Sequence, residues 1–347
     1  MADIELQAVE KHFDGVAALR SVTASIQDGE FVALLGPSGC GKSTLLRVLA
    51  GFEAPTRGQI RIGAREVANA ETGQAIPPEA RNIGFVFQSY ALWPHMSVRR
   101  NVSYPLEVRG LTKVARVART DAALAATGLM PFADRMPADL SGGQRQRVAL
   151  ARCLVSDPAA VLLDEPLANL DVALRSSMQA VFSDFHTRTG ATMVYVTHDQ
   201  AEAMAMADRI AVMSDGEIVQ FDTPEKLYNQ PDNRFVASFV GEGTVLPIEA
   251  VTIGQVGMEA QVLGSRIAIT SQDENPNLIC LRPENISICE TSDLRAQVVR
   301  ATYLGGTYRL DLQTNSGAMV VAHARQRHAE GTQLGLSISN PWAFTEV

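Results

Sequence analysis

The stretch of residues 36–44 constrains the fold of this chain more than any other part of the sequence. It fits the pattern G-x-x-x-x-G-K-[ST], and the apolar run of residues 31–35 comes directly before it. This order predicts a buried strand that turns into a helix, with glycines that let successive main-chain N–H groups converge on phosphate oxygens. We therefore expect a nucleotide-phosphate site in which Lys42 reaches the terminal phosphates and Ser43 holds Mg²⁺. The predicted phosphate loop consists of Gly36, Pro37, Ser38, Gly39, Cys40, Gly41, Lys42, Ser43 and Thr44.

A second glycine-rich turn, Leu140-Ser141-Gly142-Gly143-Gln144, is predicted to open another helix. Read alone, it is an ordinary helix start, because Ser141 is a good N-cap and apolar residues at helical spacing follow it. The phosphate loop alone is equally unspecific, since kinases, GTPases and many ATPases share it. The meaning of the two segments depends on the polar residues that lie between and beyond them.

Two adjacent carboxylates end an apolar run that is too short for a helix. Residues 160–163 predict a buried parallel strand, and Asp164 and Glu165 follow at its carboxyl end, where α/β sheets bind ligands. We expect Asp164 to anchor Mg²⁺ and Glu165 to orient and deprotonate the attacking water. A solvated acidic turn is the alternative, which the phosphate loop upstream disfavours.

Three further polar residues each have a functional and a purely structural interpretation. Gln88 follows the strand pattern of residues 83–87, so its amide is a candidate contact for both the metal and the water, or only a loop residue. His198 follows the strand pattern of residues 193–197 and is either a γ-phosphate ligand or a structural hydrogen-bonding group. Asp171 is either part of the site or only the N-cap of the next helix.

The order of these motifs along the chain resembles that in the ATP-binding subunit of a bacterial ABC importer. The resemblance covers residues 1 to about 235. By this resemblance, residues 36–44 correspond to the Walker A loop and residues 140–144 to the signature motif. The remaining correspondences are Gln88 to the Q-loop, Asp164 to the Walker B carboxylate, Glu165 to the catalytic base, Asp171 to the D-loop and His198 to the switch histidine.

The resemblance implies a homodimer in which two copies face each other head to tail and bind ATP and Mg²⁺ between them. The Lys42 loop of one copy and the turn of residues 141–144 of the other would clamp the same nucleotide, with Asp171 nearby. Catalysis would use Lys42, Gln88, Glu165 and His198, and the metal ligands would be Ser43, Gln88 and Asp164. The family also implies two transmembrane permease subunits and, indirectly, an extracytoplasmic solute-binding protein.

Phe13 follows an amino-terminal strand pattern in which Ile4, Leu6 and Ala8 alternate with polar residues. It resembles the aromatic residue that stacks on adenine in the family, where Tyr is often found. Phe keeps the ring face and loses the hydroxyl group. The alternative is an aromatic residue of the hydrophobic core.

Composition agrees with a cytoplasmic ATPase bound peripherally to the inner face of a bacterial cell membrane. The net charge of −8 argues against an extended nucleic-acid surface, which needs a basic patch. The four cysteines show no paired metal-ligand spacing, so we expect a reduced protein without disulfides. The sequence lacks a signal-peptide pattern and any apolar stretch near the roughly 20 residues that span a bilayer.

Between Gln88 and Leu140 the pattern changes from strands to helices, which predicts a helical subdomain at about residues 89–158. Val114, Val117 and Leu124 mark one apolar face of a helix that Gly128 ends. Leu92, Trp93 and Met96 either pack in the core or line a groove for a partner helix. The family resemblance favours docking on a transmembrane subunit, with Gln88 linking that contact to the nucleotide.

The fold class that we expect is an α/β P-loop ATPase with a RecA-like core and antiparallel β and helical subdomains, followed by a small all-β OB/TOBE-like barrel. The ATPase domain would span residues 1–235 and the regulatory barrel residues 236–347. The turn of residues 282–286 resembles the one found in barrels of importer ATPases for sugars, polyamines and ferric iron. The predicted strands are 267–270, 278–281, 297–299, 309–312 and 319–322.

The sequence therefore predicts the ATP-hydrolysing subunit of a solute importer, with ferric iron or a polyamine as solute rather than a sugar. A soluble ABC ATPase that acts on ribosomes or DNA is the alternative. Such proteins usually carry two cassettes or long coiled-coil insertions, whereas this chain has one set of motifs and no sustained heptads. A third hypothesis, compatible with the first, makes the barrel a sensor that inhibits transport.

Overall fold

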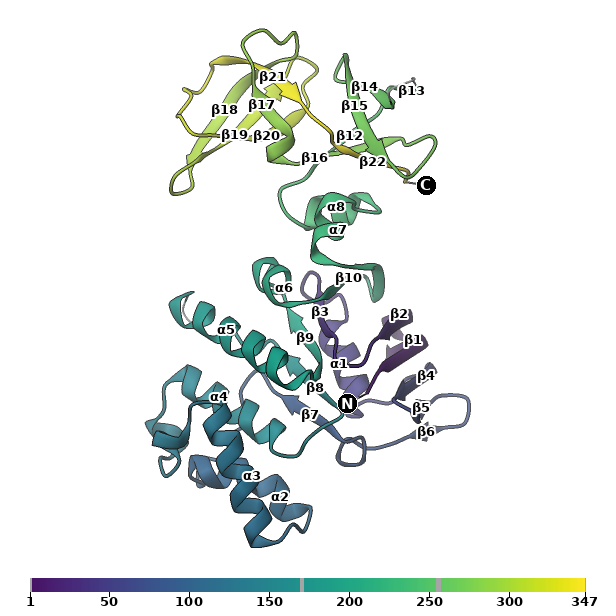
Figure 1. Cartoon of the computed structure of the whole chain (residues 1–347). Helices are drawn as coiled ribbons and strands as arrows, with labels where there is room; N and C mark the ends of the chain where they lie inside the picture. The colour runs from purple at the N-terminus through teal and green to yellow at the C-terminus, as the bar shows by residue number, and fades with distance from the viewer. Residues whose placement is uncertain (1, 169–171, 254–256, 347) are drawn as a thin grey trace. The chain divides into compact units, whose positions relative to one another are not determined.

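The computed structural model describes residues 2–168, 172–253 and 257–346, which divide into two compact units, Met1–Pro224 and Glu225–Val347 (Figure 1). The sequence-based boundary between residues 235 and 236 stays a prediction. In the structure, helix α8 (Arg234–Phe239) belongs to the second unit.

The first unit contains a six-stranded sheet in the order β11-β10-β3-β9-β8-β7 and a five-stranded antiparallel sheet in the order β2-β1-β4-β5-β6. The strands of the larger sheet are parallel except for β11, which forms a hairpin with β10. The strands are β1 (Ile4–Phe13), β2 (Val16–Ile26), β3 (Phe31–Leu35), β4 (Arg57–Ile62), β5 (Arg65–Asn69), β6 (Gln74–Ala75), β7 (Ile83–Val86), β8 (Ala160–Asp164), β9 (Thr192–Thr197), β10 (Arg209–Ser214) and β11 (Glu217–Asp222). The helices that follow or connect them are α1 (Lys42–Ala50), α2 (Val98–Val108), α3 (Lys113–Ala126), α4 (Gly142–Leu154), α5 (Val172–Thr189) and α6 (Gln200–Met206).

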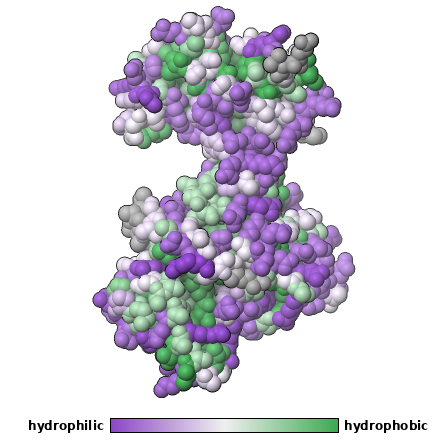
Figure 2. All heavy atoms as spheres, viewed as in Figure 1, coloured by the Kyte–Doolittle hydropathy of each residue, from purple (hydrophilic) through white to green (hydrophobic). Residues whose placement is uncertain are grey.

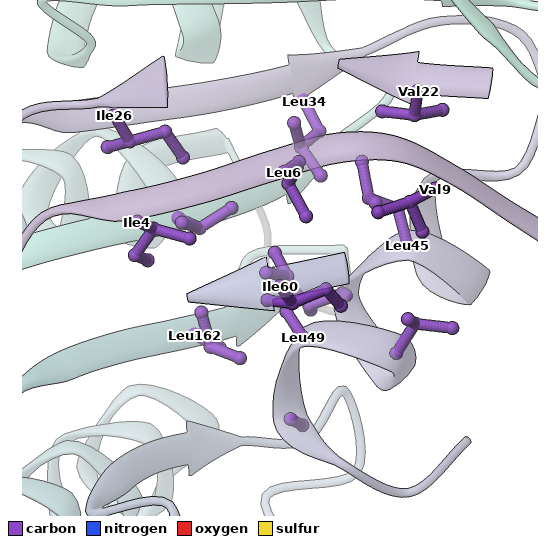
Figure 3. Packing of buried hydrophobic residues seen from close by; sticks show 14 of the residues in the cluster. Ile4, Leu6, Val9, Val22, Ile26, Leu34, Leu45, Leu49, Ile60 and Leu162 are labelled. Carbon is purple, nitrogen blue, oxygen red and sulfur yellow. The ribbon is translucent and has the colours of Figure 1, made fainter. Parts of the chain in front are cut away.

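The parallel strands are apolar on both sides because each side faces a different core. On β8, Ala160 and Leu162 face the core shared with α1 and the antiparallel sheet, whereas Val161 and Leu163 face the core shared with α4 and α5. Leu45 and Leu49 of α1 pack against strand residues of both sheets (Figure 3). A strand buried on both faces reads as a continuous apolar run, which is why the sequence revealed these strands clearly.

Strand β1 departs from the alternation that its sequence predicts. Ile4 and Leu6 are buried, but Ala8 is exposed and Val9 takes the next core position. The register shifts between Leu6 and Val9, and Ala8 has a φ of 48°, so a β-bulge reverses the facing of the strand. The predicted strand is present, and the bulge is the reason that Ala8 does not share the buried face of Ile4 and Leu6.

The helical region consists of α2, α3 and α4, which share a core that includes Val102, Leu124 and Val148. The predicted apolar face of α3 was wrong in part. Val114 is 81% exposed and Val117 is 50% exposed, whereas Leu124 is fully buried. The side of α3 that faces the core carries Thr120, Ala123 and Leu124, so small and polar residues hid the true face from a reading of large apolar residues.

In its described residues the second unit is mainly β, with two short α-helices and two sheets around a main core, beside a smaller cluster that includes Ala237 of α8 and Cys280. Their orders are β12-β16-β22-β15-β14-β13 and β17-β21-β18-β19-β20. The five predicted strands lie within β15, β16, β18, β19 and β20, and the structure adds six more that are short or interrupted by turns. The elements are α7 (Pro224–Asn229), α8, β12 (Thr244–Pro247), β13 (Ala250–Ile253), β14 (Met258–Val262), β15 (Ser265–Ser271), β16 (Leu278–Leu281), β17 (Ile286–Ile288), β18 (Arg295–Tyr303), β19 (Tyr308–Thr314), β20 (Met319–Ala324), β21 (Gln333–Ile338) and β22 (Trp342–Phe344).

The face of the molecule shown in Figure 2 is covered mainly by hydrophilic residues, with apolar residues in small groups. Among the described residues, none of the helices has the length and apolar character needed to cross a membrane.

The burial of α3 yields a test of its orientation. We expect Leu124→Ala to lower the free energy of unfolding by about 2–5 kcal/mol, because it leaves a cavity in the helical core. Val114→Ala, on the same helix, should change it by less than about 0.5 kcal/mol. Urea unfolding followed by circular dichroism measures both, and equal losses would contradict the orientation described.

Candidate active site

The carboxyl ends of four parallel strands meet at one edge of the larger sheet. Leu35 pairs with Thr197, Asp164 pairs with Val196, and Val86 pairs with Leu163. The phosphate loop, Glu165 and His198 directly follow or adjoin these strand ends, and Gln88 comes two residues after β7. Sheet register therefore brings together residues as far apart in sequence as Gly36 and His198.

The phosphate loop requires glycine at two places for reasons visible in its surroundings. Gly41 has a φ of 104°, and a Cβ atom there would lie 2.6 Å from the carbonyl oxygen of Ala18. A Cβ atom on Gly36 would lie 2.3 Å from the carbonyl oxygen of Met213. The loop is thus curled tightly against β2 and β10, and its main chain remains open to a phosphate group at Gly39, where a Cβ atom would meet nothing within 4 Å.

Lys42 lies inside this curl rather than in solvent. It is 5% exposed, and its Nζ donates to the carbonyl oxygens of Gly36 at 2.7 Å and Pro37 at 2.8 Å. The ammonium group is therefore held against the first residues of the phosphate loop. Lys42 is also the first residue of α1, where the helix dipole favours an anion.

Ser43 and Asp164 form the oxygen-rich part of the site. The Ser43 hydroxyl donates to Asp164 Oδ1 at 3.1 Å. Burial raises the pKa of Asp164, and the Ser43 hydrogen bond and the nearby Arg47 and Lys42 charges only partly oppose this effect. A buried carboxylate of this kind is stabilised by a cation, and carboxylate and hydroxyl oxygens are ligands that Mg²⁺ prefers. The two residues would therefore fit a magnesium ion.

Glu165 is the point where the strand-end residues converge. Its Oε2 lies 3.4 Å from Gln88 Nε2 and 3.5 Å from His198 Nδ1. The residue has a φ of 42°, and its N–H donates to the carbonyl oxygen of Val196. A non-glycine residue in the left-handed region is uncommon and is held here by the neighbouring strand. The structure thus places Gln88 against Glu165 rather than against the pair of Ser43 and Asp164.

The turn of residues 141–144 has the geometry of a capping box. The Gln144 N–H donates to Ser141 Oγ at 3.3 Å, and the Ser141 N–H donates to Gln144 Oε1 at 2.9 Å. The N-cap interpretation of Ser141 is therefore correct as a description of its local structure. It does not compete with a nucleotide role, since the capped amino terminus of a 13-residue helix also favours an anion.

Phe13 is 42% exposed at the end of β1, and Lys11 Nζ lies 4.8 Å from the centre of its ring. The alternative of a core aromatic residue is therefore wrong. Asp171 lies outside the described residues. Its role and the adenine contact of Phe13 stay predictions.

The sequence analysis missed two polar residues that hold the segment after Gln88. Arg152 of α4 is 9% exposed and donates to the carbonyl oxygens of Ala91 at 2.6 Å and Tyr90 at 2.9 Å. Asn101 of α2 is fully buried and forms hydrogen bonds with main-chain atoms of Trp93 in both directions. Their signal was a polar residue in an otherwise buried helical position.

A groove of about 530 Å³ lies beside this segment, between β7, α2 and α4. Its walls include Phe87, Trp93, Tyr104 and Val108, and Arg152 lies over the Trp93 ring at 4.8 Å. Of the three residues predicted for a partner groove, Trp93 lines it, Leu92 packs against the hydrophobic cores, and Met96 is not among the residues of its wall.

Comparison with known proteins agrees with this geometry. A family profile described as ABC transporter matches residues 19–168, and one described as TOBE domain matches residues 279–344. The spermidine/putrescine import ATP-binding protein PotA 2 of Pseudomonas aeruginosa is 41% identical over 98% of this chain and 96% of its own length. The Fe(3+) ions import ATP-binding protein FbpC of Rhizobium etli is 42% identical over 94% of this chain and 92% of its own length.

The trehalose/maltose import ATP-binding protein MalK of Thermococcus litoralis is 47% identical over 72% of this chain and 68% of its own length. Among solved structures, the dimeric post-hydrolysis cassette MJ0796 bound to ADP and Pi is 32% identical with a TM-score of 0.55, covering 64% of this chain and 98% of that one. The chain therefore belongs to the family of ABC transporter ATP-binding proteins with a carboxyl-terminal TOBE domain. It is an ATPase, and the predicted fold class is confirmed.

Burial of Asp164 predicts opposite effects on stability and activity. A carboxyl pKa that is raised on folding means that stability falls as pH rises from the usual pKa towards the raised one, so the ionised group destabilises the fold at neutral pH. Asp164→Asn keeps an acceptor for Ser43 and removes the charge, and should raise the Tm of the nucleotide-free protein. Hydrolysis should fall on the order of a hundredfold or more, because metal charge stabilisation contributes several kcal/mol.

The matched control is Asp184→Asn on the exposed side of α5, which should leave Tm and hydrolysis unchanged. Scanning calorimetry and phosphate release measure the two effects. A lower Tm for Asp164→Asn would contradict the stated cost of the buried charge.

Proposed function

We propose that this chain powers solute import as the ATP-hydrolysing subunit of an ABC transporter at the cytoplasmic face of a bacterial cell membrane. The observation that carries the proposal is the likeness to import ATP-binding proteins over nearly the whole chain, TOBE domain included. A soluble ATPase acting on ribosomes or DNA is not favoured, because relatives that match over this length are named as import or uptake ATP-binding proteins.

In the proposed reaction, Glu165 accepts a proton from water as the water attacks the γ-phosphate of ATP. Its convergence with Gln88 and His198 supports this role, because both side chains can orient the carboxylate and the water. Lys42 stabilises charge on the terminal phosphates. Ser43 and Asp164, with Gln88 as the third predicted ligand, would hold Mg²⁺, which when bound neutralises charge that develops on the phosphate oxygens.

We further propose that the site is completed by a second copy of the chain. The turn of residues 141–144 opens a helix whose amino terminus can bind an anion, and a related cassette is described as dimeric. ATP that is bound more tightly by the closed pair than by the open one would drive closure, and hydrolysis would reopen the pair. Only this difference in affinity can move an attached protein.

The groove beside Trp93 is the proposed docking site for a helix of a transmembrane permease subunit. Its aromatic and apolar wall suits the apolar face of a helix. The carbonyl oxygens of Tyr90 and Ala91, which lie two and three residues beyond Gln88, are bonded to Arg152 in the same wall. A helix seated in the groove would therefore influence the position of Gln88.

For the solute, we favour ferric iron or a polyamine over a sugar. The relatives named for those solutes match over more than 90% of both chains, whereas the trehalose/maltose relative matches over 68% of its length. The solute itself would be selected by an extracytoplasmic binding protein and the permease. Identification of the binding protein encoded beside this chain, followed by its binding of Fe³⁺ or spermidine, tests this choice.

Replacement of the proposed base tests the mechanism. Glu165→Gln should bind ATP, accumulate as dimers and hydrolyse ATP about 10²–10⁴-fold more slowly, because the amide cannot accept the proton. Size-exclusion chromatography with ATP and phosphate release measure the two effects. Lys42→Ala is the control and should bind nucleotide poorly. Rapid turnover by Glu165→Gln would exclude Glu165 as the base.

A mixing experiment tests the shared site. Ser141→Arg should block hydrolysis and keep nucleotide binding by the monomer, and Lys42→Ala should also be inactive. Mixed in equal amounts, the two variants form pairs in which one intact Lys42 faces one intact Ser141, so hydrolysis should return in part. If mixing restores nothing, and Ser141→Arg also abolishes binding by the monomer, the shared site is wrong.

A further inference from the structure

A buried glutamate lies behind the loop that carries His198. Glu202 of α6 is 4% exposed, and its Oε2 accepts hydrogen bonds from Tyr195 Oη at 2.7 Å and from Thr197 Oγ1 at 2.8 Å. Burial, followed by the charge of Glu202, raises the pKa of Tyr195, so this phenol remains a hydrogen-bond donor. A glutamate such as Glu202 is rarely buried unless it is paired, because removal of a carboxylate from water is costly.

The partner of this carboxylate comes from a different helix. Arg175 of α5 places its Nε 3.5 Å from Glu202 Oε1, and its Nη1 donates to Asp199 Oδ2 at 3.0 Å. Asp199 in turn caps α6 by accepting from the N–H groups of Ala201 and Glu202. One guanidinium group therefore joins α5 to the first turn of α6.

Together these contacts clamp the main chain on both sides of His198. Thr197 precedes it and is fixed by Glu202, and Asp199 follows it and is fixed by Arg175. The Asp199 N–H also donates to Thr197 Oγ1 at 3.0 Å, which closes the clamp across His198. The His198 side chain itself is 60% exposed and has Glu165 as its neighbour at 3.5 Å, so its position depends on the main chain that carries it.

The side chain of Glu202 does not make the contact that a glutamate at this helix position usually makes. Asp199 is the N-cap of α6, so Glu202 is the third residue of the helix, from which a glutamate commonly reaches back to the N-cap main chain at the surface. Here the side chain instead turns inward to the end of β9. The helix would be capped by Asp199 without it, so capping does not account for Glu202.

We propose that Glu202 is a positioning residue for ATP hydrolysis, which acts by holding His198 against Glu165, and that Arg175 links this position to α5. The proposal rests on the proposed role of His198. Groups that orient a reacting side chain commonly contribute about 10–100-fold to activity without touching the substrate.

A double-mutant cycle on the full-length protein tests the proposal. We expect Glu202→Ala to lower kcat about 10–100-fold while KM for ATP changes less than about twofold, and Glu202→Gln, which keeps one acceptor oxygen, to lose less. In a His198→Ala background, Glu202→Ala should cause little further loss, because the group that it positions is already absent. Independent, multiplicative losses would overturn the proposal.

The single variant His198→Ala separates the two levels of the hypothesis. If it hydrolyses ATP at the normal rate, the role of His198 is wrong and the role of Glu202 falls with it. If it is impaired while Glu202→Ala is normal, only the positioning role of Glu202 is wrong. Should Glu202→Ala fail to fold, the same cycle is measured with Glu202→Gln and with Arg175→Met, and additivity in both would overturn the proposal equally.

Discussion

The register between β3, β9, β8 and β7 is the constraint on which the rest of the structure depends. Because these strands are parallel and aligned at their carboxyl ends, one edge of the sheet gathers a lysine loop, two carboxylates, an amide and an imidazole. Strands β3, β8 and β9 are buried on both faces, so a slip of one residue in any of them would exchange the side chains that face the two cores. The same packing that stabilises the sheet therefore fixes the distances among the groups that we propose to act on ATP.

Parts of the fold that depend on local sequence were predictable, and parts that depend on tertiary partners were not. The phosphate loop and the strand ends were predictable because glycine spacing and continuous apolar runs are local properties of the sequence. The bulge at Ala8 and the exposure of Val114 were not, since both depend on partners in β4 and α4 that periodicity does not reveal. In the second unit, five of the six strands that were not predicted have only three to five residues, which is too short for a clear alternation.

The same reasoning explains which site residues were missed. Lys42, Asp164 and Glu165 stand next to recognisable motifs, whereas Arg152, Asn101, Arg175 and Glu202 lie inside helices where polar residues usually face solvent. Arg152, Asn101 and Glu202 are buried against main-chain oxygens or hydroxyl groups, and Arg175 pairs with the carboxylates of Asp199 and Glu202. Only tertiary packing reveals these contacts. None of these residues belongs to a recognised motif. Each one instead holds the main chain near a motif residue in place.

Helix α4 carries two of these features on one rigid rod of about 20 Å, given its 13 residues and a rise of about 1.5 Å each. Ser141 caps one end of the helix. Near the other end, Arg152 donates a hydrogen bond to the main chain of the segment after Gln88. A tilt of this rod cannot displace one end alone. If a ligand in the groove at Arg152 changes the affinity of the Ser141 end for an anion, thermodynamic reciprocity requires the anion to change occupancy of the groove by the same factor.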